Sequence, residues 1–66
     1  MAPEKTDRLL PLPAVIYATG FSAPTIYRKI AAGEFPHPMK IGRASRWSEN
    51  DVQNWIEAQK AVPATA

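Results

Sequence analysis

Proline and glycine divide the first half of the chain into two short segments that cannot merge into a single helix. Pro13 fits the first helical position, where its missing N–H is not needed, and Gly20 fits the left-handed stop at the helix end. Pro24 and Gly33 bound a second segment in the same way. Ser22 before it is the predicted N-cap, whose hydroxyl satisfies a backbone donor of the first turn. Two short helices joined by a Gly-containing turn are typical of a helix-turn-helix.

The second of these helices is expected to be amphipathic. At about 100° per residue, its side chains separate into an apolar side and a polar, basic side. The apolar side carries Ala23, Ile26, Tyr27 and Ile30. The opposite side carries Pro24, Thr25, Arg28, Lys29 and Ala32. One face is therefore expected to pack on the core, and the other is left for solvent or for a partner.

The segment MKIGRASRW, residues 39–47, has two short stretches that flank Gly42, which indicates a β-hairpin. A three-residue loop at 42–44 predicts these cross-strand pairs: Ile41 with Ser45, Lys40 with Arg46, and Met39 with Trp47. Alternation then directs Met39, Ile41 and Trp47 inward. Because like charges directly opposite each other destabilise a hairpin, the outward pair of Lys40 and Arg46 favours a role in gripping phosphates.

The remaining segments flank this centre. Residues 8–10 are expected to form a short strand before a proline. Ser48–Asp51 resembles a capping box with Asp in place of Glu, which predicts the start of a last helix. That helix is expected to pack on the core through Val52, Trp55 and Ile56, and Trp47 is also a predicted core residue. His37 lies between two prolines and is interpreted as a solvated connector residue rather than a metal ligand.

The length of 66 residues predicts one domain, in which about 60% of the unfolded surface is buried. We expect three parts: a flexible leader at 1–7, a folded domain at 8–60 and a disordered tail at 61–66. With no cysteine and one histidine, neither a disulfide nor a metal site is expected, and no cofactor or catalytic residue is predicted. No apolar run is long enough to cross a membrane. The default expectation is a cytoplasmic protein, associated with the nucleoid when bound to DNA.

Charge is unevenly distributed along the chain. Residues 28–47 carry five Lys or Arg side chains against Glu34 alone, and residues 48–66 carry three acids against Lys60. Such asymmetry favours a polyanionic partner for the middle of the chain, with scattered surface charge as the alternative.

The order helix, turn, helix, hairpin, helix predicts a small α+β fold, the winged helix-turn-helix, with three helices and a short two-stranded wing. In such a protein a helix enters the major groove of DNA, while the hairpin reaches the backbone or the neighbouring minor groove. Phosphate contacts supply most of the affinity. The candidate DNA-binding residues are Ser22, Thr25, Tyr27, Arg28, Lys29, Lys40, Arg43 and Arg46.

These candidates also have structural interpretations. Ser22 is first an N-cap, although the helix end it caps can also hold a phosphate. Tyr27 falls on the core side by its angle, and its hydroxyl remains a candidate phosphate contact. Thr25 is either a contact to a base or phosphate of DNA or an ordinary residue of the first helical turn. Lys29 lies further round the helix and suits a phosphate rather than a base.

Three stretches of the chain resemble the AlpA family of small phage-type transcriptional regulators, which is grouped with excisionases and MerR-like winged-helix proteins. They are LLPLPAVIYATGFS, TIYRKIAAGEFPHPMKIG and SRWSENDVQNWI, and together they cover Leu9–Ile56. The resemblance implies a regulator or a recombination directionality factor that binds repeated DNA sites, often cooperatively. It implies a recognition segment with Thr25, Tyr27 and Arg28, and a basic wing with Lys40, Arg43 and Arg46.

The chain departs from the family in one place. The family usually has a basic residue directly after the serine, where this chain has Ala23 and Pro24. Base contacts are therefore expected to fall more heavily on Thr25, Arg28 and Lys29.

Sequence-specific binding of double-stranded DNA is the leading functional hypothesis. The alternative is an adaptor without its own DNA contact, such as an antirepressor or an integrase partner. An integrase or RNA polymerase is a candidate protein partner, and self-assembly on DNA repeats is a further hypothesis. The single histidine and the lack of cysteine argue against an enzyme. RNA readers usually expose stacking aromatic side chains, whereas both tryptophans are predicted to be core residues.

Overall fold

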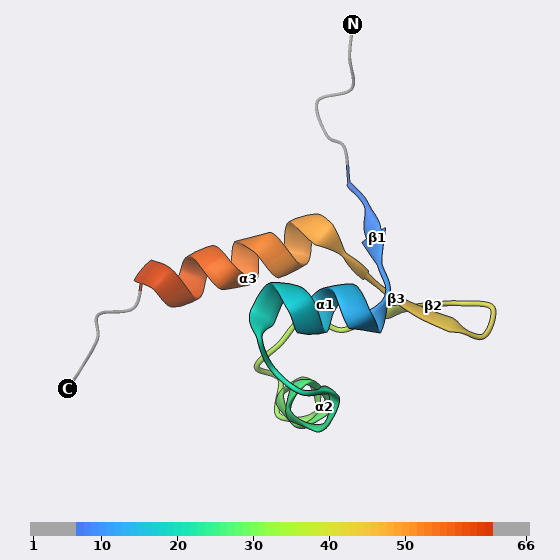
Figure 1. Ribbon diagram of the computed structural model, residues 1–66, viewed down its shortest axis with the longest axis horizontal. Coiled ribbons are helices and arrows are strands. Elements are labelled where there is room, and N and C mark those ends of the chain that lie inside the picture. The colour runs from blue at the N-terminus through green and yellow to red at the C-terminus, as the bar shows by residue number, and fades with distance from the viewer. Residues whose placement is uncertain (1–6, 62–66) are drawn as a thin grey trace, which may run out of the picture.

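The computed structural model describes residues 7–61, which form three helices and a three-stranded antiparallel sheet. The elements in chain order are β1 (Leu9–Leu10), α1 (Leu12–Thr19), α2 (Ala23–Ala31), β2 (Met39–Ile41), β3 (Ala44–Ser48) and α3 (Glu49–Ala61). The β2–β3 hairpin projects at one end of the molecule and α3 extends toward the other, with α1 and α2 between them (Figure 1). The predicted winged helix-turn-helix is confirmed.

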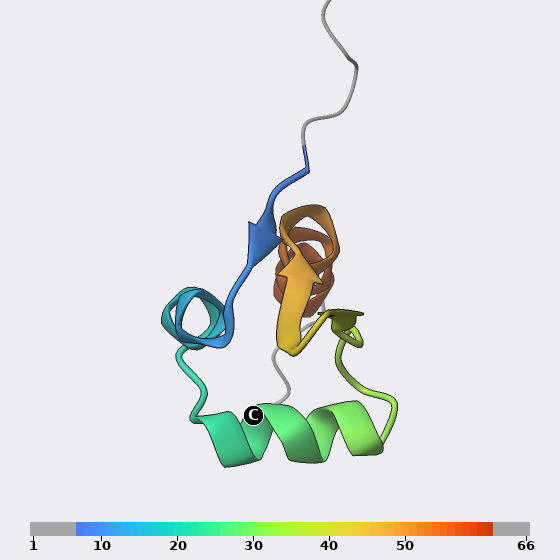
Figure 2. The ribbon, with the colours of Figure 1, turned by 90° about the vertical axis from the view of Figure 1, so that its right-hand side faces the viewer.

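The two helices of the helix-turn-helix end at the predicted glycines, and α1 begins at Leu12, one residue before the predicted first position at Pro13. Gly20 ends α1 in the left-handed region at a φ of 78°, and its N–H donates to the carbonyl oxygen of Ile16 at 2.8 Å. Gly33 follows α2 at a φ of 75°. In Figure 1, α1 lies across the view and α2 is seen end-on, whereas Figure 2 shows the reverse. The short turn at Gly20 therefore sets the two helix axes across each other.

The core contains one buried apolar side chain from each helix, one from β3 and one from the connector between α2 and β2. These residues are at most 4% exposed: Val15, Ile26, Phe35, Trp47 and Val52. The indole of Trp47 also donates to the carbonyl oxygen of Pro36 at 3.1 Å, and the indole of Trp55 donates to that of Glu34 at 2.8 Å. These two bonds fix the connector between α2 and the wing. The predicted core position of Trp47 is confirmed, and Trp55 packs against the core while half-buried.

The predicted hairpin register is wrong by one residue. The observed pairs are Met39 with Arg46, Lys40 with Ser45 and Ile41 with Ala44, so the loop has two residues rather than three. Gly42 adopts a φ of 61°. A glycine with positive φ at the first position of a two-residue loop is typical of a type II′ turn, which matches the twist of the flanking strands. Lys40 and Arg46 are therefore not opposite each other.

The corrected register changes which side chains share a face of the sheet. Paired residues lie on one face, and residues two apart on a strand lie on the same face. Lys40 and Ser45 therefore share the face of the buried Trp47. Arg46 and Met39 lie on the opposite, outer face.

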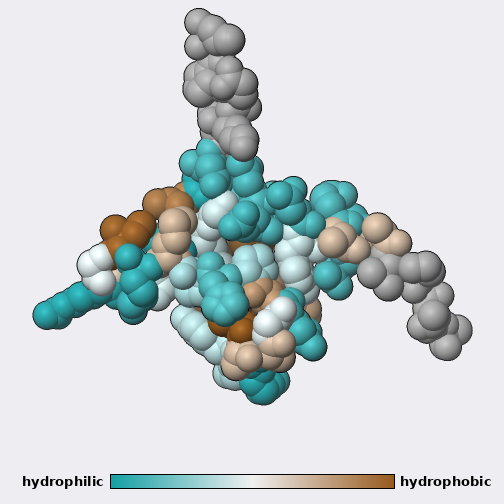
Figure 3. Space-filling view, turned by 180° about the vertical axis from the view of Figure 1, so that it is seen from behind, coloured by the Kyte–Doolittle hydropathy of each residue, from teal (hydrophilic) through white to brown (hydrophobic). Residues whose placement is uncertain are grey.

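The outer face of the sheet is partly apolar. It carries Met39, Ile41 and, through the pairing of β1 with β3, Leu9, which are 45%, 49% and 45% exposed. Figure 3 shows this apolar colour on the wing. The prediction that Met39 and Ile41 point inward is therefore wrong, because the one-residue change in loop length moves both to the other face.

The start of α3 is capped by two side chains that are far apart in sequence. The Ser48 hydroxyl accepts from the backbone N–H of Asp51 at 3.1 Å and donates to Oδ2 of Asp7 at 2.6 Å. The other oxygen of Asp7 accepts from the N–H of Asn50 at 3.0 Å. The serine of the predicted capping box is confirmed, and Asp7, which the sequence places in the leader, supplies a second cap.

The rest of the predicted leader and nearly all of the predicted tail, residues 1–6 and 62–66, lie outside the described residues. Within residues 7–61, no helix combines the length and the apolar character needed to cross a membrane.

Replacing Asp7 with asparagine is expected to lower stability at pH 7 and to have little effect at pH 2–3. The Ser48 hydroxyl and the backbone N–H of Asn50 lower the pKa of the Asp7 carboxyl, against a smaller opposing effect of desolvation. Because the folded-state pKa lies below the unfolded one, the stabilisation is present above about pH 4 and is lost as the pH falls through the folded-state pKa.

Urea unfolding of Asp7→Asn and of the wild-type chain at both pH values measures this difference. Glu57→Gln is the matched control, since Glu57 lies on α3, the helix that Asp7 caps, and its carboxylate pairs with the exposed Lys60. A loss of stability in Asp7→Asn that is the same at both pH values would contradict a role for the ionised carboxylate.

Candidate nucleic-acid interface

The polar face of α2 carries a connected row of three side chains. Ser22 occupies the N-cap position with extended backbone, but its hydroxyl makes no bond to the helix backbone. It donates instead to Oγ1 of Thr25 at 3.1 Å, and Nη2 of Arg28 donates to the same oxygen at 3.2 Å. The predicted cap position of Ser22 is confirmed, whereas the predicted capping bond of its hydroxyl is wrong. Because Thr25 accepts two bonds, its own hydroxyl hydrogen stays available for a partner.

Arg28 is the most prominent member of this row. Its side chain is exposed, and its bond to Thr25 uses only one of its five N–H donors. The remaining donors form a planar fork that suits a phosphate or the edge of a guanine.

Tyr27 lies where α2 meets the wing. Its ring is 6.3 Å from that of Trp47, centroid to centroid, in an edge-to-face arrangement, and the residue is 45% exposed. The interpretation of Tyr27 as a core residue is therefore only half right, because one side of the ring packs on Trp47 and the rest faces solvent. This contact joins the helix to the sheet face that bears Lys40.

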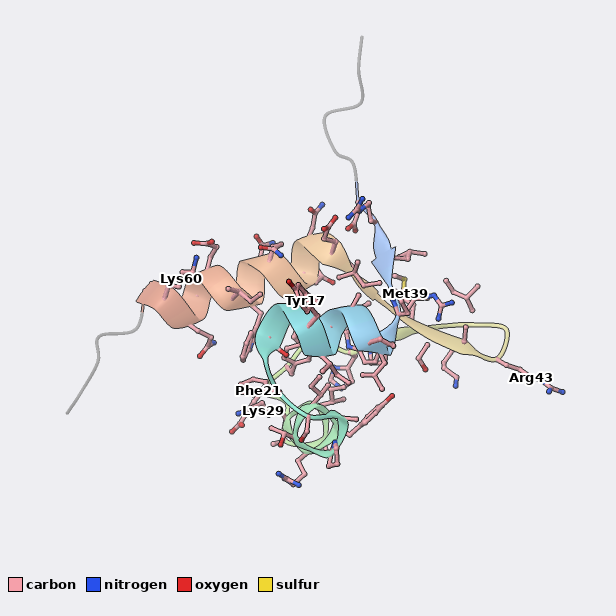
Figure 4. The ribbon with its side chains drawn as sticks, viewed as in Figure 1. Tyr17, Phe21, Lys29, Met39, Arg43 and Lys60 are labelled. Carbon is pink, nitrogen blue, oxygen red and sulfur yellow. The ribbon has the colours of Figure 1, made fainter. Side chains whose placement is uncertain are left out.

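The cations of the wing do not form one cluster. Lys40 is exposed on the sheet face that meets α2, and Arg43 is exposed in the turn at the tip of the wing (Figure 4). Arg46 lies on the outer face, half-buried, and its guanidinium donates to the carbonyl oxygen of Ser45 at 3.0 Å. The structure thus brings Lys40 to the side of α2 and directs Arg46 away from it.

Lys29 is also turned away from the Arg28 row. It is half-buried, and its ammonium lies over the ring of Phe21, with Nζ 5.2 Å from the ring centroid. Figure 4 shows both residues on the side of α2 that faces α3. Lys29 therefore lies at the border between two sides of α2. Its ammonium is on the side that faces α3, and the residue also lines a shallow hollow with Thr25 and Arg28.

The comparison with known proteins agrees with this arrangement. The family described as prophage CP4-57 regulatory protein (AlpA) matches residues 8–60. The chain belongs to the AlpA family. This confirms the resemblance seen in the sequence, and it places the chain among phage-type regulatory proteins.

A phage protein is also similar to this AlpA-family chain. The uncharacterized protein ORF88 of Enterobacteria phage P4 is 34% identical over 56 residues. The match covers 83% of this chain and 64% of the phage protein, so the chain spans less than two thirds of that relative's length.

Two residues near the interface were missed by sequence reasoning. Ser45 pairs with Lys40 and therefore lies on the α2 side of the wing, which a two-residue loop at Gly42 would have predicted. Glu34 lines the hollow beside Arg28 and places an acid at the end of the polar face of α2. In the sequence, Glu34 is the lone acid of the basic segment at 28–47, and this could have identified it as a residue near the interface.

Proposed function

We propose that this AlpA-family protein binds double-stranded DNA sequence-specifically, as a transcriptional regulator or an excisionase of a phage or integrative element. In this proposal α2 enters the major groove and the β2–β3 wing lies on the backbone or in the neighbouring minor groove. One observation carries it. The row of Thr25 and Arg28 on α2 and the Lys40 face of the wing lie on adjoining sides of the molecule, joined by the contact of Tyr27 with Trp47.

The residues have different proposed roles. Arg28 and Thr25 reach base edges, because residues near the start of a recognition helix enter the groove most deeply. Lys40 and Arg43 contact phosphates, where a flexible cation gives affinity without sequence preference. Ser22, Tyr27 and Lys29 border this surface and are proposed phosphate contacts, and Arg46 is proposed as a more distant one.

The protein partners of this function are proposals as well. An integrase suits an excisionase and RNA polymerase suits a regulator, and cooperative assembly on repeated sites suits either. Footprinting on phage DNA distinguishes these roles, since sites beside an attachment site favour excision and sites at a promoter favour regulation.

Fluorescence anisotropy with labelled duplexes tests DNA binding directly. The affinity is expected to fall with salt, with a log–log slope of about −0.9 for each phosphate neutralised. Non-specific binding has typical dissociation constants of about 10⁻⁴ to 10⁻⁶ M at physiological salt. Failure to bind any duplex at low salt would contradict the proposal and favour an adaptor.

Lys40→Ala is expected to weaken DNA binding more than Arg46→Ala. Each change removes one positive charge, so the two variants are matched in net charge. Lys40 lies on the α2 side of the wing and Arg46 on the outer face. Loss of the Lys40 phosphate contact is expected to lower affinity about 3- to 10-fold and to reduce the salt slope by about 0.9.

Anisotropy titrations of both variants across a salt series provide the measurement, and thermal melting confirms that both remain folded. Arg46→Ala is expected to stay within about 2-fold of the wild-type affinity, as for a cation whose proposed phosphate contact is more distant. Equal losses in the two variants would show that the wing acts only through its total charge.

A further inference from the structure

A groove lies on the side of α2 that is turned toward α3. It has a volume of about 410 Å³ and is formed by the end of α1, the turn after it, α2 and the C-terminal half of α3. The groove is at the end of the molecule opposite the wing, as the positions of Phe21, Lys60 and Arg43 in Figure 4 show. Its volume falls within the range of pockets that take small ligands or a few side chains.

Two aromatic rings and one aliphatic side chain make the groove apolar. Phe21 and Trp55 both line it, and their rings meet edge-to-face at 6.0 Å between centroids. Trp55 is held from behind by Phe35, at 4.9 Å between ring centroids, and by its hydrogen bond to the Glu34 carbonyl oxygen. Ile56 adds an aliphatic surface. The rings are therefore fixed in place and suit a large apolar side chain.

The charge of the groove has one sign. Among its described lining residues, Lys29 and Lys60 are the charged ones, and no carboxylate lines it. Lys29 is held over the Phe21 ring, where a cation–π contact positions its ammonium at the groove. Lys60 pairs with Glu57 at 3.4 Å, but both side chains are about two thirds exposed, so this pair is weak and easily exchanged. An apolar groove bordered by two lysines is complementary to carboxylates around an apolar side chain.

We propose that this groove docks a short acidic segment of a protein partner. One large apolar side chain of the segment packs on Phe21 and Trp55, and carboxylates on either side of it pair with Lys29 and Lys60. Duplex DNA is the poorer occupant, because a phosphate backbone offers no large apolar group to pack on Phe21 and Trp55. This proposal goes beyond DNA binding and uses a separate surface, with Lys29 alone common to both.

The test is an NMR titration of the full ¹⁵N-labelled chain with a capped peptide of sequence EDFLDE. The indole N–H signal of Trp55 is expected to shift, whereas that of the buried Trp47 stays in place. A capped QNFLNQ peptide has the same apolar centre without charge, and it is expected to bind at least about 10-fold more weakly. No shift at Trp55, or equal binding of both peptides, would overturn the proposal.

Two variants make the test specific to the groove. Lys60→Gln is expected to weaken binding of the acidic peptide about 5-fold and to leave DNA affinity within about 2-fold of wild type. Arg8→Gln removes the same charge outside the groove, where Arg8 pairs with Glu49, and is expected to leave peptide affinity unchanged. Equal losses in both variants would show an effect of net charge alone.

A short duplex provides the competing occupant. If DNA shifts the Trp55 indole signal and displaces the peptide, the groove binds nucleic acid and the proposal fails. If Arg28→Ala abolishes DNA binding and keeps peptide binding, the two surfaces are independent, and the docking proposal stands even where DNA binding by this chain is disproved.

Discussion

Replacing Arg28 with alanine is expected to lower affinity for the specific DNA site by about 10- to 100-fold and to leave the fold intact. Arg28 is exposed and makes its hydrogen bond only to another side chain of the same helix, Thr25. Exposed substitutions of this kind change stability by about 0.5 kcal/mol or less. A bidentate contact between arginine and guanine contributes about 1–3 kcal/mol of discrimination, which corresponds to the expected loss.

The loss in Arg28→Ala also reveals which part of the DNA Arg28 contacts. A base contact lowers affinity for the specific duplex and spares a scrambled one, whereas a phosphate contact lowers both and reduces the salt slope by about 0.9. Anisotropy titrations on both duplexes separate these outcomes. The alanine variant would contradict the interface if it bound both duplexes within about 2-fold of the wild-type protein.

Arg28→Lys separates the effect of the positive charge from that of the guanidinium's planar shape. Lysine keeps the charge but lacks the planar fork that makes two parallel hydrogen bonds. It is therefore expected to retain most of the affinity for the scrambled duplex and to lose most of the preference for the specific site. Lys60→Gln, on the far side of the molecule from the wing, controls for the loss of one positive charge.

The helical part of the fold was predictable because local chemistry decides it. Gly20 and Gly33 both adopt the positive φ that the sequence predicts for them. Proline is tolerated in the first turn of a helix, because its missing N–H would have no helical partner there. Ile26 becomes fully buried because the helical period places it on the inner face of α2. Each of these outcomes depends on neighbours within one or two turns of the chain.

The hairpin register was not predictable in the same way. A loop of two or three residues fits the sequence around Gly42, and the choice moves every side chain of β2 to the other face. The two-residue loop leaves Met39 and Ile41 about half exposed. A sequence argument that places apolar residues inward therefore favours the wrong loop. The turn conformation of Gly42 outweighs the exposure of Met39 and Ile41, whereas Trp47 faces inward in either register.

Long-range caps were beyond sequence reasoning. Asp7 and Ser48 are 41 residues apart, and only the pairing of β1 with β3 brings them together. At Ser22 the sequence predicts a capping bond that the structure does not form, since its hydroxyl bonds Thr25 rather than the backbone. For the candidate interface, the helical period identified Arg28 correctly as exposed, whereas the separation of Lys40 from Arg46 required the sheet itself.

Replacing Trp47 with alanine is expected to lower the free energy of unfolding by about 3–5 kcal/mol. Trp47 is fully buried and is the largest buried side chain. Truncating such a residue costs about 3–5 kcal/mol. A chain of 66 residues has a total stability of about 3–10 kcal/mol at the usual value per residue. The loss therefore removes between about a third and all of the stability, and far-UV circular dichroism with urea titration measures it.

Trp47→Phe distinguishes the packing of this residue from its role in placing the wing. Phenylalanine keeps much of the volume but leaves the Pro36 carbonyl oxygen without its indole donor, at a cost of about 1–2 kcal/mol. Trp47 also contacts Tyr27 and lies on the Lys40 face of β3. Trp47→Phe is therefore expected to remain folded and to lose DNA affinity as the wing shifts against α2. Trp55→Phe removes the matching bond to Glu34, at the groove rather than at the wing. If both variants lost DNA affinity equally, general destabilisation would explain the effect, and the placement of the wing by Trp47 would be disproved.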